Sequence, residues 1–548
     1  MSARISTPFG HALPPASRHS VAVHMGPWEN VEKYGSDSSS VIITLSNAAP
    51  PMKPPKDIAE LGAIILERIG AENMACYLFS SLQSARECVE YSTSERRDSS
   101  SGKKSIPQDQ ITIRAFTAVD RFFAVIFPHD SIASVAGFWN VSGAGISSRF
   151  AETALKHINR LSEVPILGND AVRPGFESIA HRTIRERIAQ HVRRAPLVID
   201  LPRPYADDVY LFQTGMAAIY KPHTYMLRRS KGTVVLFGMA LMDTLALFEE
   251  FGTGFKFFGN GNDKDLDALE EFLEQEYQRE NIVKAIWAEF PANPLLATPD
   301  LTRLRALADK YEVVLAIDDT VGSWANVDII HLADMLVTSL TKSFNGYADA
   351  MAGSVVINPE SRVYHYLKSL FDHYHVPELY VDDAEVVEKN SRNYLSRTAQ
   401  LNHNASSLVQ YLLSCAEDPD SAVKAVYYPS VNRSVASYRK FMRPAAPDFS
   451  PGYGCLLCVE LEDLPTTAAF YDNLNVHKGP HLGASVTLAF AFTMCAYKDR
   501  LEWAEQYGLK PTQIRISAGL EDTEMLVQDF RVAVEAANKI KHHNPSVT

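Results

Sequence analysis

The sequence predicts an α/β protein with a mostly parallel β-sheet in its large domain, a smaller C-terminal α/β domain and an N-terminal α/β extension. Between residues 201 and 370, short apolar runs alternate with amphipathic runs, which is typical of a parallel sheet with helical crossovers. Residues 371–548 contain long helical patterns and two further apolar runs, which predict the small domain. The length of 548 residues also requires more than one domain.

The first 200 residues divide into three predicted parts. Residues 1–55 are rich in Pro, Ser and small residues without a period, which favours a disordered tail. Residues 56–160 form the predicted extension, because a helix-spaced run at 57–70 precedes the strand-like runs ITIRAFT and RFFAVIFP. Residues 161–200 are interpreted as an arm that leads into the large domain.

The large domain, residues 201–370, shows the strand and helix alternation most clearly. Its predicted strands are the apolar runs at 232–238, 281–290, 313–319 and 333–340. The run at 263–280 starts with Asp and repeats Leu and Phe at helical spacing, so it predicts an amphipathic helix. Ligands of such sheets bind beyond the carboxyl ends of the strands, where this sequence places several polar residues.

Composition excludes several classes of function. The net charge of −12, from 53 Lys and Arg against 65 Asp and Glu, argues against nucleic-acid or membrane-surface binding, which needs a basic face. The longest apolar stretch contains Asp243 and is too short for a membrane span, and no secretory signal is visible. Cys455 and Cys458 lie in a strand-like run without a second ligand pair, so no metal site is predicted. A cytoplasmic protein is expected.

Lys342 follows a predicted strand in LVTSLTKSFNGYADAMAG, together with the hydroxyls of Ser339 and Thr341. Desolvation and a cationic neighbourhood lower the pKa of a lysine and make its amine nucleophilic. The neighbouring hydroxyls are suited to phosphate oxygens, although most lysines that follow strands are simply solvated.

Three other motifs place polar groups near the same sheet edge. In VVLAIDDT, Asp318 or Asp319 can pair with a protonated pyridine nitrogen, and the alternation of the strand favours Asp318. In FQTGMAAIY, Gly215 and Met216 open a helix whose free N–H groups can bind phosphate. Each of these segments is also compatible with an ordinary turn or helix cap, as is AEFPANP, which presents Glu289 and Asn293.

Arg515 lies inside an apolar strand in QIRISAGLED and therefore needs a partner. A substrate carboxylate and an internal salt bridge are equally compatible with this position.

These motifs together resemble the Cys/Met-metabolism family of pyridoxal phosphate (PLP) enzymes, which includes cystathionine γ-synthase and cystathionine γ-lyase. TGMAAI, AEFPANP, IDDT, SLTKSFNG and IRISAGLED follow the order of the family over about residues 200–540. The sequence resembles most the fungal cystathionine γ-synthase-like branch, which also carries an N-terminal extension. The resemblance implies a fold-type I, aminotransferase-like architecture, PLP as cofactor, and a homodimer or homotetramer with shared active sites.

The resemblance also implies roles for the matching residues. Lys342 is the catalytic lysine that holds PLP, Asp318 pairs with the ring nitrogen, and Arg515 grips the substrate α-carboxylate. The remaining implied cofactor contacts are the phosphate cup of Gly215, Met216, Ser339 and Thr341, then Thr320 next to the aspartates, Asn293 near the 3-oxygen of the ring, Phe237 stacked on the ring, and Arg173 from a neighbouring subunit.

The sequence departs from the family pattern at three places. Phe237 falls where relatives stack a tyrosine, so no phenol is available there as an acid or base. The apolar residues 239–242 replace polar residues that often follow it. His481 and Leu482 lie near the carboxylate site, where the family often has Ser-Leu-Gly.

The predicted reaction is γ-replacement on an activated, O-acylated L-homoserine by a second, nucleophilic substrate. The apolar run 239–242 favours an apolar thiol or a carbon nucleophile over cysteine, and such a preference would belong to specialised metabolism. The run can equally serve only as core packing. The alternatives are a β- or γ-lyase of sulfur amino acids on the same scaffold, and a non-catalytic homologue that acts as a binding scaffold.

Overall fold

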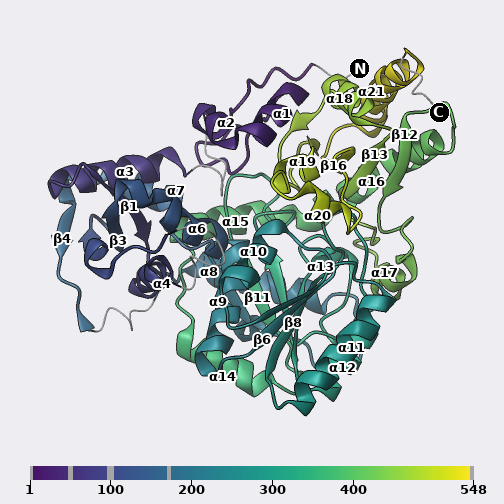
Figure 1. Ribbon diagram of the computed structural model, residues 1–548. Coiled ribbons are helices and arrows are strands. Elements are labelled where there is room, and N and C mark those ends of the chain that lie inside the picture. The colour runs from purple at the N-terminus through teal and green to yellow at the C-terminus, as the bar shows by residue number, and fades with distance from the viewer. Residues whose placement is uncertain (1–3, 47–53, 96–103, 169–174, 544–548) are drawn as a thin grey trace.

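The computed structural model describes residues 4–46, 54–95, 104–168 and 175–543, and these contain three β-sheets (Figure 1). The predicted α/β class with a mostly parallel sheet is confirmed. In the view of Figure 1, the N-terminal sheet with its helices lies to the left of the large domain, and the C-terminal domain lies above the large domain.

The N-terminal sheet is antiparallel and has the strand order β1-β3-β2-β4. Its strands are β1 (Met74–Phe79), β2 (Thr112–Thr117), β3 (Arg121–Pro128) and β4 (Ser162–Val164). The helices around it are α3 (Lys56–Arg68), α4 (Leu82–Thr93), α6 (Ile132–Ser142) and α7 (Ser148–Lys156). Phe138 of α6 packs 5.8 Å from the ring of Tyr220 in the large domain, so the cores of the two regions are continuous.

The large-domain sheet has seven strands in the order β5-β11-β10-β9-β8-β6-β7. Only β11 runs antiparallel to its neighbours, β5 and β10. The strands are β5 (Val209–Phe212), β6 (Thr233–Phe237), β7 (Phe255–Phe258), β8 (Val283–Glu289), β9 (Val314–Asp318), β10 (Met335–Ser339) and β11 (Gly353–Ile357).

Helices cover both faces of this sheet. They are α8 (Ile179–Arg193), α9 (Gly215–Arg229), α10 (Met242–Glu250), α11 (Asp263–Gln278), α12 (Leu301–Lys310), α13 (Ser323–Asn326), α14 (Tyr364–Tyr374) and α15 (Val381–Asn390). Because side chains alternate along a strand, Val235 and Phe237 face one apolar cluster whereas Val234 and Leu236 face the other.

The C-terminal sheet has the order β12-β13-β16-β15-β14. Its strands are β12 (Val423–Tyr427), β13 (Leu456–Leu461), β14 (His477–Lys478), β15 (Leu488–Phe490) and β16 (Gln513–Ser517). The accompanying helices are α16 (Tyr394–Ala416), α17 (Val435–Phe441), α18 (Leu464–Asn473), α19 (Phe492–Ala496), α20 (Leu501–Glu505) and α21 (Thr523–His543). This sheet matters for the site because β16 carries Arg515 between β13 and β15.

Residues 4–46 differ from the expected disordered tail. They contain α1 (Trp28–Ser36) and α2 (Ser38–Thr44), and they pack along the C-terminal domain. Trp28 lies 5.7 Å from the ring of Tyr471, and the backbone N–H of Val21 donates to the carbonyl of Ala348 at 2.8 Å. The order comes from tertiary contacts of isolated apolar side chains, which leave no local period in the sequence. No helix in the described ranges is long and apolar enough to cross a membrane.

Candidate active site

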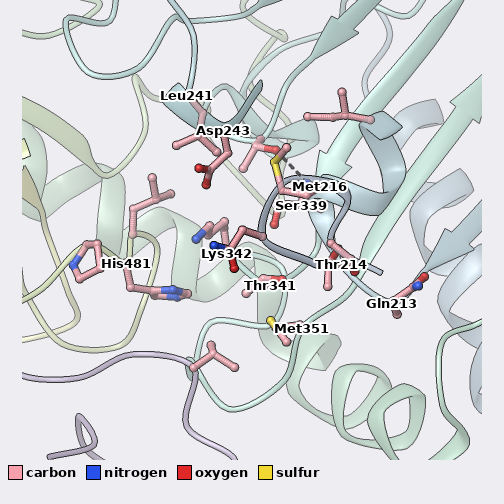
Figure 2. Close-up of a pocket in the computed structure, with 18 of the residues that line it drawn as sticks. Gln213, Thr214, Met216, Leu241, Asp243, Ser339, Thr341, Lys342, Met351 and His481 are labelled. Atoms are coloured by element: carbon pink, nitrogen blue, oxygen red, sulfur yellow. Dashed lines mark hydrogen bonds between the residues drawn. The ribbon is translucent and has the colours of Figure 1, made fainter. Parts of the chain in front are cut away.

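A cavity of about 230 Å³ lies beyond the carboxyl ends of β8, β9 and β10 (Figure 2). Glu289, Asp318 and Ser339 end these three strands and line the cavity. Parallel strands bring such end residues together at one sheet edge. The C-terminal domain adds Arg515 and residues 480–482 to the wall. The N-terminal extension also adds a wall, formed by Trp139, Asn140 and residues 143–147.

Lys342 lies in the turn after β10 and projects into the cavity (Figure 2). Burial and the nearby Arg515 guanidinium lower the pKa of Lys342 to about 8, although the charges of Asp243 and Asp318 act in the opposite direction. A lysine with this pKa is partly neutral near neutral pH, so its amine can act as a nucleophile or a base. Lys342 therefore has the properties that a cofactor-holding lysine requires.

The two neighbouring aspartates have different environments. Asp318 lines the cavity, and its carboxylate accepts a hydrogen bond from the Thr320 backbone N–H at 2.9 Å. Asp319 is 1% exposed and accepts a hydrogen bond from the Thr338 hydroxyl, outside the cavity. Only Asp318 can therefore meet a molecule in the cavity. Burial raises the pKa of Asp318 above its usual range, so a cationic partner would favour its ionised form.

The N-terminus of α9 forms one end of the cavity. Thr214 caps this helix by accepting a hydrogen bond from the Ala217 N–H at 3.0 Å. The N–H groups of Gly215 and Met216 belong to the first turn, where helices leave donors free. Gly215 lies so close to β10 that a Cβ there would be 2.6 Å from the Ser339 hydroxyl oxygen, so only glycine leaves this corner open.

The predicted hydroxyl residues make different contacts. The Ser339 hydroxyl lines the cavity and has no hydrogen bond to another described residue. The Thr320 hydroxyl accepts the Ser339 N–H at 2.8 Å, and the Thr341 hydroxyl bonds to both the N–H and the carbonyl of Ala352. Both threonines also line the cavity, but their present hydrogen bonds hold the loop that carries Lys342.

Arg515 reaches the cavity from β16 and is only 3% exposed. Its guanidinium donates to the Asn293 side-chain oxygen at 3.2 Å and to the Pro480 carbonyl, and it lies 4.7 Å from the centre of the Phe492 ring. Burial lowers the pKa of Arg515 to about 10. Among the residues that the structure describes, no carboxylate forms an ion pair with Arg515. The internal salt bridge considered from the sequence is therefore absent from this part of the chain.

His481 and Leu482 line the cavity beside Arg515, as expected from the sequence. His481 is 4% exposed, and its Nε2 has no hydrogen-bond partner among the described residues. Burial and the charges of Lys342 and Arg515 hold the pKa of His481 well below its usual range, so this ring is neutral.

Phe237 does not line the cavity, so the prediction that it stacks on the cofactor ring is wrong. It is the last residue of β6 and is 1% exposed, and it packs with Val235 and Phe258 in the apolar cluster on one face of the sheet. The alternation of the strand directs its side chain into that core. Leu241, four residues later, lines the cavity instead. Arg173 lies outside the described residues.

Sequence reasoning also missed several cavity residues. Gln213, Thr214, Asp243 and Met351 line the cavity and are labelled in Figure 2, together with Leu241 of the predicted apolar run 239–242. One signal was available for Asp243, because a carboxylate soon after a strand in an otherwise apolar run requires an explanation. The contribution of Trp139 and its neighbours had no local signal.

The sheet order, together with the lysine after β10 and the carboxylate at the end of β9, belongs to a fold-type I architecture, the fold that a solved cystathionine gamma synthase shares with this chain. The family model described as Cys/Met metabolism PLP-dependent enzyme matches residues 204–535, and that of the fungal trans-sulfuration enzyme N-terminal domain matches residues 57–147. The chain belongs to the Cys/Met metabolism family of PLP-dependent enzymes.

Several curated proteins are similar to the chain over much of its length. The cystathionine gamma-synthase-like enzyme iboG2 of Amanita muscaria is 32% identical and the alignment covers 98% of each chain. Alanine racemase ungC of Aspergillus violaceofuscus is 32% identical over 96% of each chain. The cystathionine gamma-synthase of Neurospora crassa is 39% identical over 61% of this chain and 52% of its own length.

A solved structure supports the fold. Cystathionine gamma synthase from Xanthomonas oryzae pv. oryzae, in complex with cystathionine, has a TM-score of 0.54 at 21% identity and covers 68% of this chain and 90% of its own.

The cavity fits PLP. The corner between Gly215 and Ser339 offers N–H donors and a hydroxyl that have no partner within the described ranges and can bind a phosphate, and a Cβ at position 215 would close it. Lys342 and Asp318 line the same cavity, so they could hold the aldehyde and the ring nitrogen, respectively, of one PLP molecule.

Proposed function

We propose that the protein catalyses γ-replacement on an O-acylated L-homoserine. In the net reaction, the bond between the γ-carbon and the acyl oxygen breaks, and a second substrate supplies the new substituent together with one proton for the departing carboxylate. The similarity to cystathionine γ-synthase-like proteins over nearly the whole chain supports the choice of reaction. The arrangement of Lys342 and Arg515 in one cavity supports the choice of an α-amino acid as first substrate.

Arg515 is the residue best suited to bind the substrate. It is a buried cation that faces the cavity, and its hydrogen-bond partners among the described residues are neutral oxygens, those of Asn293 and Pro480. The charge of Glu289 acts on it from a distance without forming an ion pair. A buried charge without a counter-ion is costly, and a bidentate carboxylate removes this cost. We infer that the α-carboxylate of the substrate binds there, with His481 and Leu482 at its side.

PLP, when bound, supplies a ring that withdraws electrons from the α-carbon of the amino acid. Lys342 is inferred to hold the cofactor before the reaction and to move the α-proton once its amine is free. Asp318 is inferred to keep the proton on the ring nitrogen. The phosphate is inferred to bind at Gly215, Met216, Ser339 and Thr341, with Thr320 supporting Ser339 and Asn293 near the 3-oxygen of the ring.

We propose that the second substrate is a weakly polar thiol or a carbon acid. Leu241 supports this choice because it presents an apolar surface to the cavity. The support from the rest of the run 239–242 is smaller than the sequence implied, because Met239 and Ala240 are 7% and 1% exposed and pack in apolar clusters.

The active unit is proposed to be a homodimer or homotetramer with shared active sites. Ile179, Ile199 and Tyr205 leave 76%, 81% and 66% of their surface exposed in the single chain, which is unusual for large apolar side chains. All three belong to or adjoin the arm between the extension and the large domain, so this surface is available to a second copy.

Product analysis tests the proposed function. The holoenzyme is given O-acetyl- or O-succinyl-L-homoserine with cysteine, an alkyl thiol and a β-keto compound in competition, and the products are identified by mass. A γ-substituted amino acid is expected. Formation of 2-oxobutanoate and ammonia with every nucleophile would identify a γ-lyase instead, and cystathionine as the dominant product would refute the preference for an apolar nucleophile.

A further inference from the structure

Asp243 is a carboxylate in the active-site cavity that no role assigned above uses. It lies in the first turn of α10, directly after the apolar run 239–242, and Figure 2 shows its carboxylate directed toward the Lys342 side chain. The backbone N–H of Leu241 donates to the Glu289 carboxylate at 2.7 Å, and the Tyr497 hydroxyl lies 3.4 Å from the Ala240 carbonyl. These contacts fix the turn, so Asp243 holds a defined position beside the apolar surface of Leu241.

The Asp243 carboxylate has no hydrogen bond or ion pair with another described residue. Burial raises its pKa to about 6, and the positive charge of Lys342 is what opposes this rise. The other ionisable groups around it are the phenols of Tyr34 on α1 and Tyr497 after α19, and the charge of Asp243 contributes to the raised pKa of both. These phenols stay neutral and supply no counter-ion. Once Lys342 is bound to the cofactor, its charge no longer stabilises the Asp243 carboxylate. This carboxylate then needs a proton, or a hydrogen bond from a donor on another molecule.

The position of Asp243 matches the requirements of a base for the second substrate. A nucleophile that enters the cavity against Leu241 would bring its acidic hydrogen next to the only free carboxylate that the described cavity offers on that side. Asp318 is held by Thr320, and Glu289 accepts hydrogen bonds from the N–H groups of Leu241 and Asn293. Asp243 alone among these three has both carboxylate oxygens uncommitted.

We propose that Asp243 is a catalytic residue that accepts the proton of the second substrate, an inference that rests on the proposed γ-replacement. The S–H or C–H proton of the nucleophile passes to the Asp243 carboxylate, and its electron pair forms the bond to the γ-carbon. The acyloxy group leaves as a carboxylate, with the electrons of the broken bond between the γ-carbon and oxygen. The proton on Asp243 then goes to that carboxylate or to water, which restores the base for the next turnover.

The variant Asp243→Asn keeps the shape of the side chain but removes the base, and Glu249→Gln is the matched control. Glu249 lies on the same helix with 40% of its side chain exposed, pairs with Arg500 at 3.6 Å, and does not line the cavity. Three measurements separate the roles. The first is the α-proton exchange in D₂O of L-norvaline, an amino acid without a γ leaving group. The second is the rate of transfer to a series of thiols of decreasing pKa. The third is the reactivity of Lys342 toward an amine reagent in the apoenzyme as the pH is varied.

For Asp243→Asn, the exchange rate is expected to stay within about twofold, because Lys342 performs that step. Transfer to alkyl thiols is expected to fall on the order of 100-fold or more, the size of a general-base contribution. The loss should shrink as the thiol pKa falls, because a thiolate needs no base. In the apoenzyme, the variant should titrate Lys342 at a lower pH than the wild type, since one nearby negative charge is lost. Glu249→Gln should change none of these values.

Several results would overturn the proposal. An equal loss of exchange and transfer would mean that Asp243 acts through Lys342, and a loss independent of thiol pKa would exclude a base. A loss confined to cysteine would assign Asp243 to the ammonium group of that substrate. If the wild type transfers to nucleophiles and Asp243→Asn does so at the same rate, the role of Asp243 is rejected and the proposed γ-replacement is not. A wild type that exchanges norvaline but transfers to no nucleophile would reject the proposed function, and the inference with it.

Discussion

Replacement of Arg515 by glutamine should weaken substrate binding while leaving cofactor binding intact. The guanidinium contacts Asn293 and the Pro480 carbonyl through two different nitrogen atoms, and the Phe492 ring at 4.7 Å supports its plane. This fixed orientation suits the two oxygens of a carboxylate. Loss of one buried charge pair costs about 2–5 kcal/mol. At about 1.4 kcal/mol per factor of ten, kcat/KM for the amino acid should fall between about 30-fold and several thousand-fold.

The assay is steady-state kinetics with the O-acyl homoserine as the varied substrate, combined with a PLP titration of the apoenzyme. The glutamine side chain can still donate to one of the two oxygens, so we expect a folded protein with a modest loss of stability, about 1–3 kcal/mol for the oxygen left unpaired. Arg443→Gln is the matched control, because Arg443 is also 3% exposed and donates to the carbonyls of Trp324 and Val192, away from the cavity.

This control should lower thermal stability without a specific change in the KM for the amino acid. If Arg515→Gln lost PLP, or if both variants changed KM equally, Arg515 would be a structural residue and the assignment of the α-carboxylate site would be refuted.

Four further outcomes are expected. Borohydride reduction of the holoenzyme followed by peptide mapping should label Lys342, and a label on another lysine would reject its assignment. Because the pKa of Lys342 is lowered to about 8 and the neutral amine is the reactive form, the rate of PLP uptake by the apoenzyme should rise about tenfold per pH unit below pH 8 and level off above it. Asp318→Asn should keep the fold and bound PLP but lose most turnover, whereas a greater loss for Asp319→Asn would show that the wrong carboxylate was chosen. Sedimentation should show a dimer or tetramer, and a fully active monomer would contradict shared active sites.

Much of the large domain could be predicted from the sequence because its signals are local. Each strand there is a continuous apolar run, and the polar residue that ends the run marks the sheet edge. Asp318, Ser339 and Lys342 follow this rule, and all three line the cavity. Arg515 could also be predicted to face a binding partner, because a charge inside an apolar strand needs one.

Phe237 shows where the same local reasoning fails. The resemblance places Phe237 where relatives stack a tyrosine on the ring, but a strand directs successive side chains to opposite faces. As the last residue of β6, Phe237 shares the face of Val235 and enters the core. The cavity begins only after the turn, at Leu241 and Asp243. The length of that turn, and the Glu289 contact that fixes it, are tertiary features that the apolar run does not encode in its pattern.

The N-terminal extension forms part of the cavity wall and contacts the helix at one end of the cavity. Lys221 of α9 is 2% exposed and forms an ion pair with Glu87 of the extension at 2.9 Å, and Glu378 lies 3.6 Å from the same amine.

The hydroxyls of Ser81 and Ser84 donate to Glu378, and Gln213 of the cavity wall donates to it at 3.2 Å. The Thr214 hydroxyl, which caps α9, also donates to the carbonyl of Gly143 at 2.9 Å.

Removal of the extension would therefore take the Glu87 carboxylate from Lys221 and the Ser81 and Ser84 hydroxyls from Glu378, and leave Lys221, Glu378 and Gln213 with one another as partners. The N-terminus of α9 faces the expected phosphate position, and Lys221 connects this helix to the ion pairs and hydrogen bonds of the extension. The extension therefore supports the helix at the expected phosphate position, although the residues 57–147 that match the N-terminal family model contain none of the residues assigned to PLP chemistry.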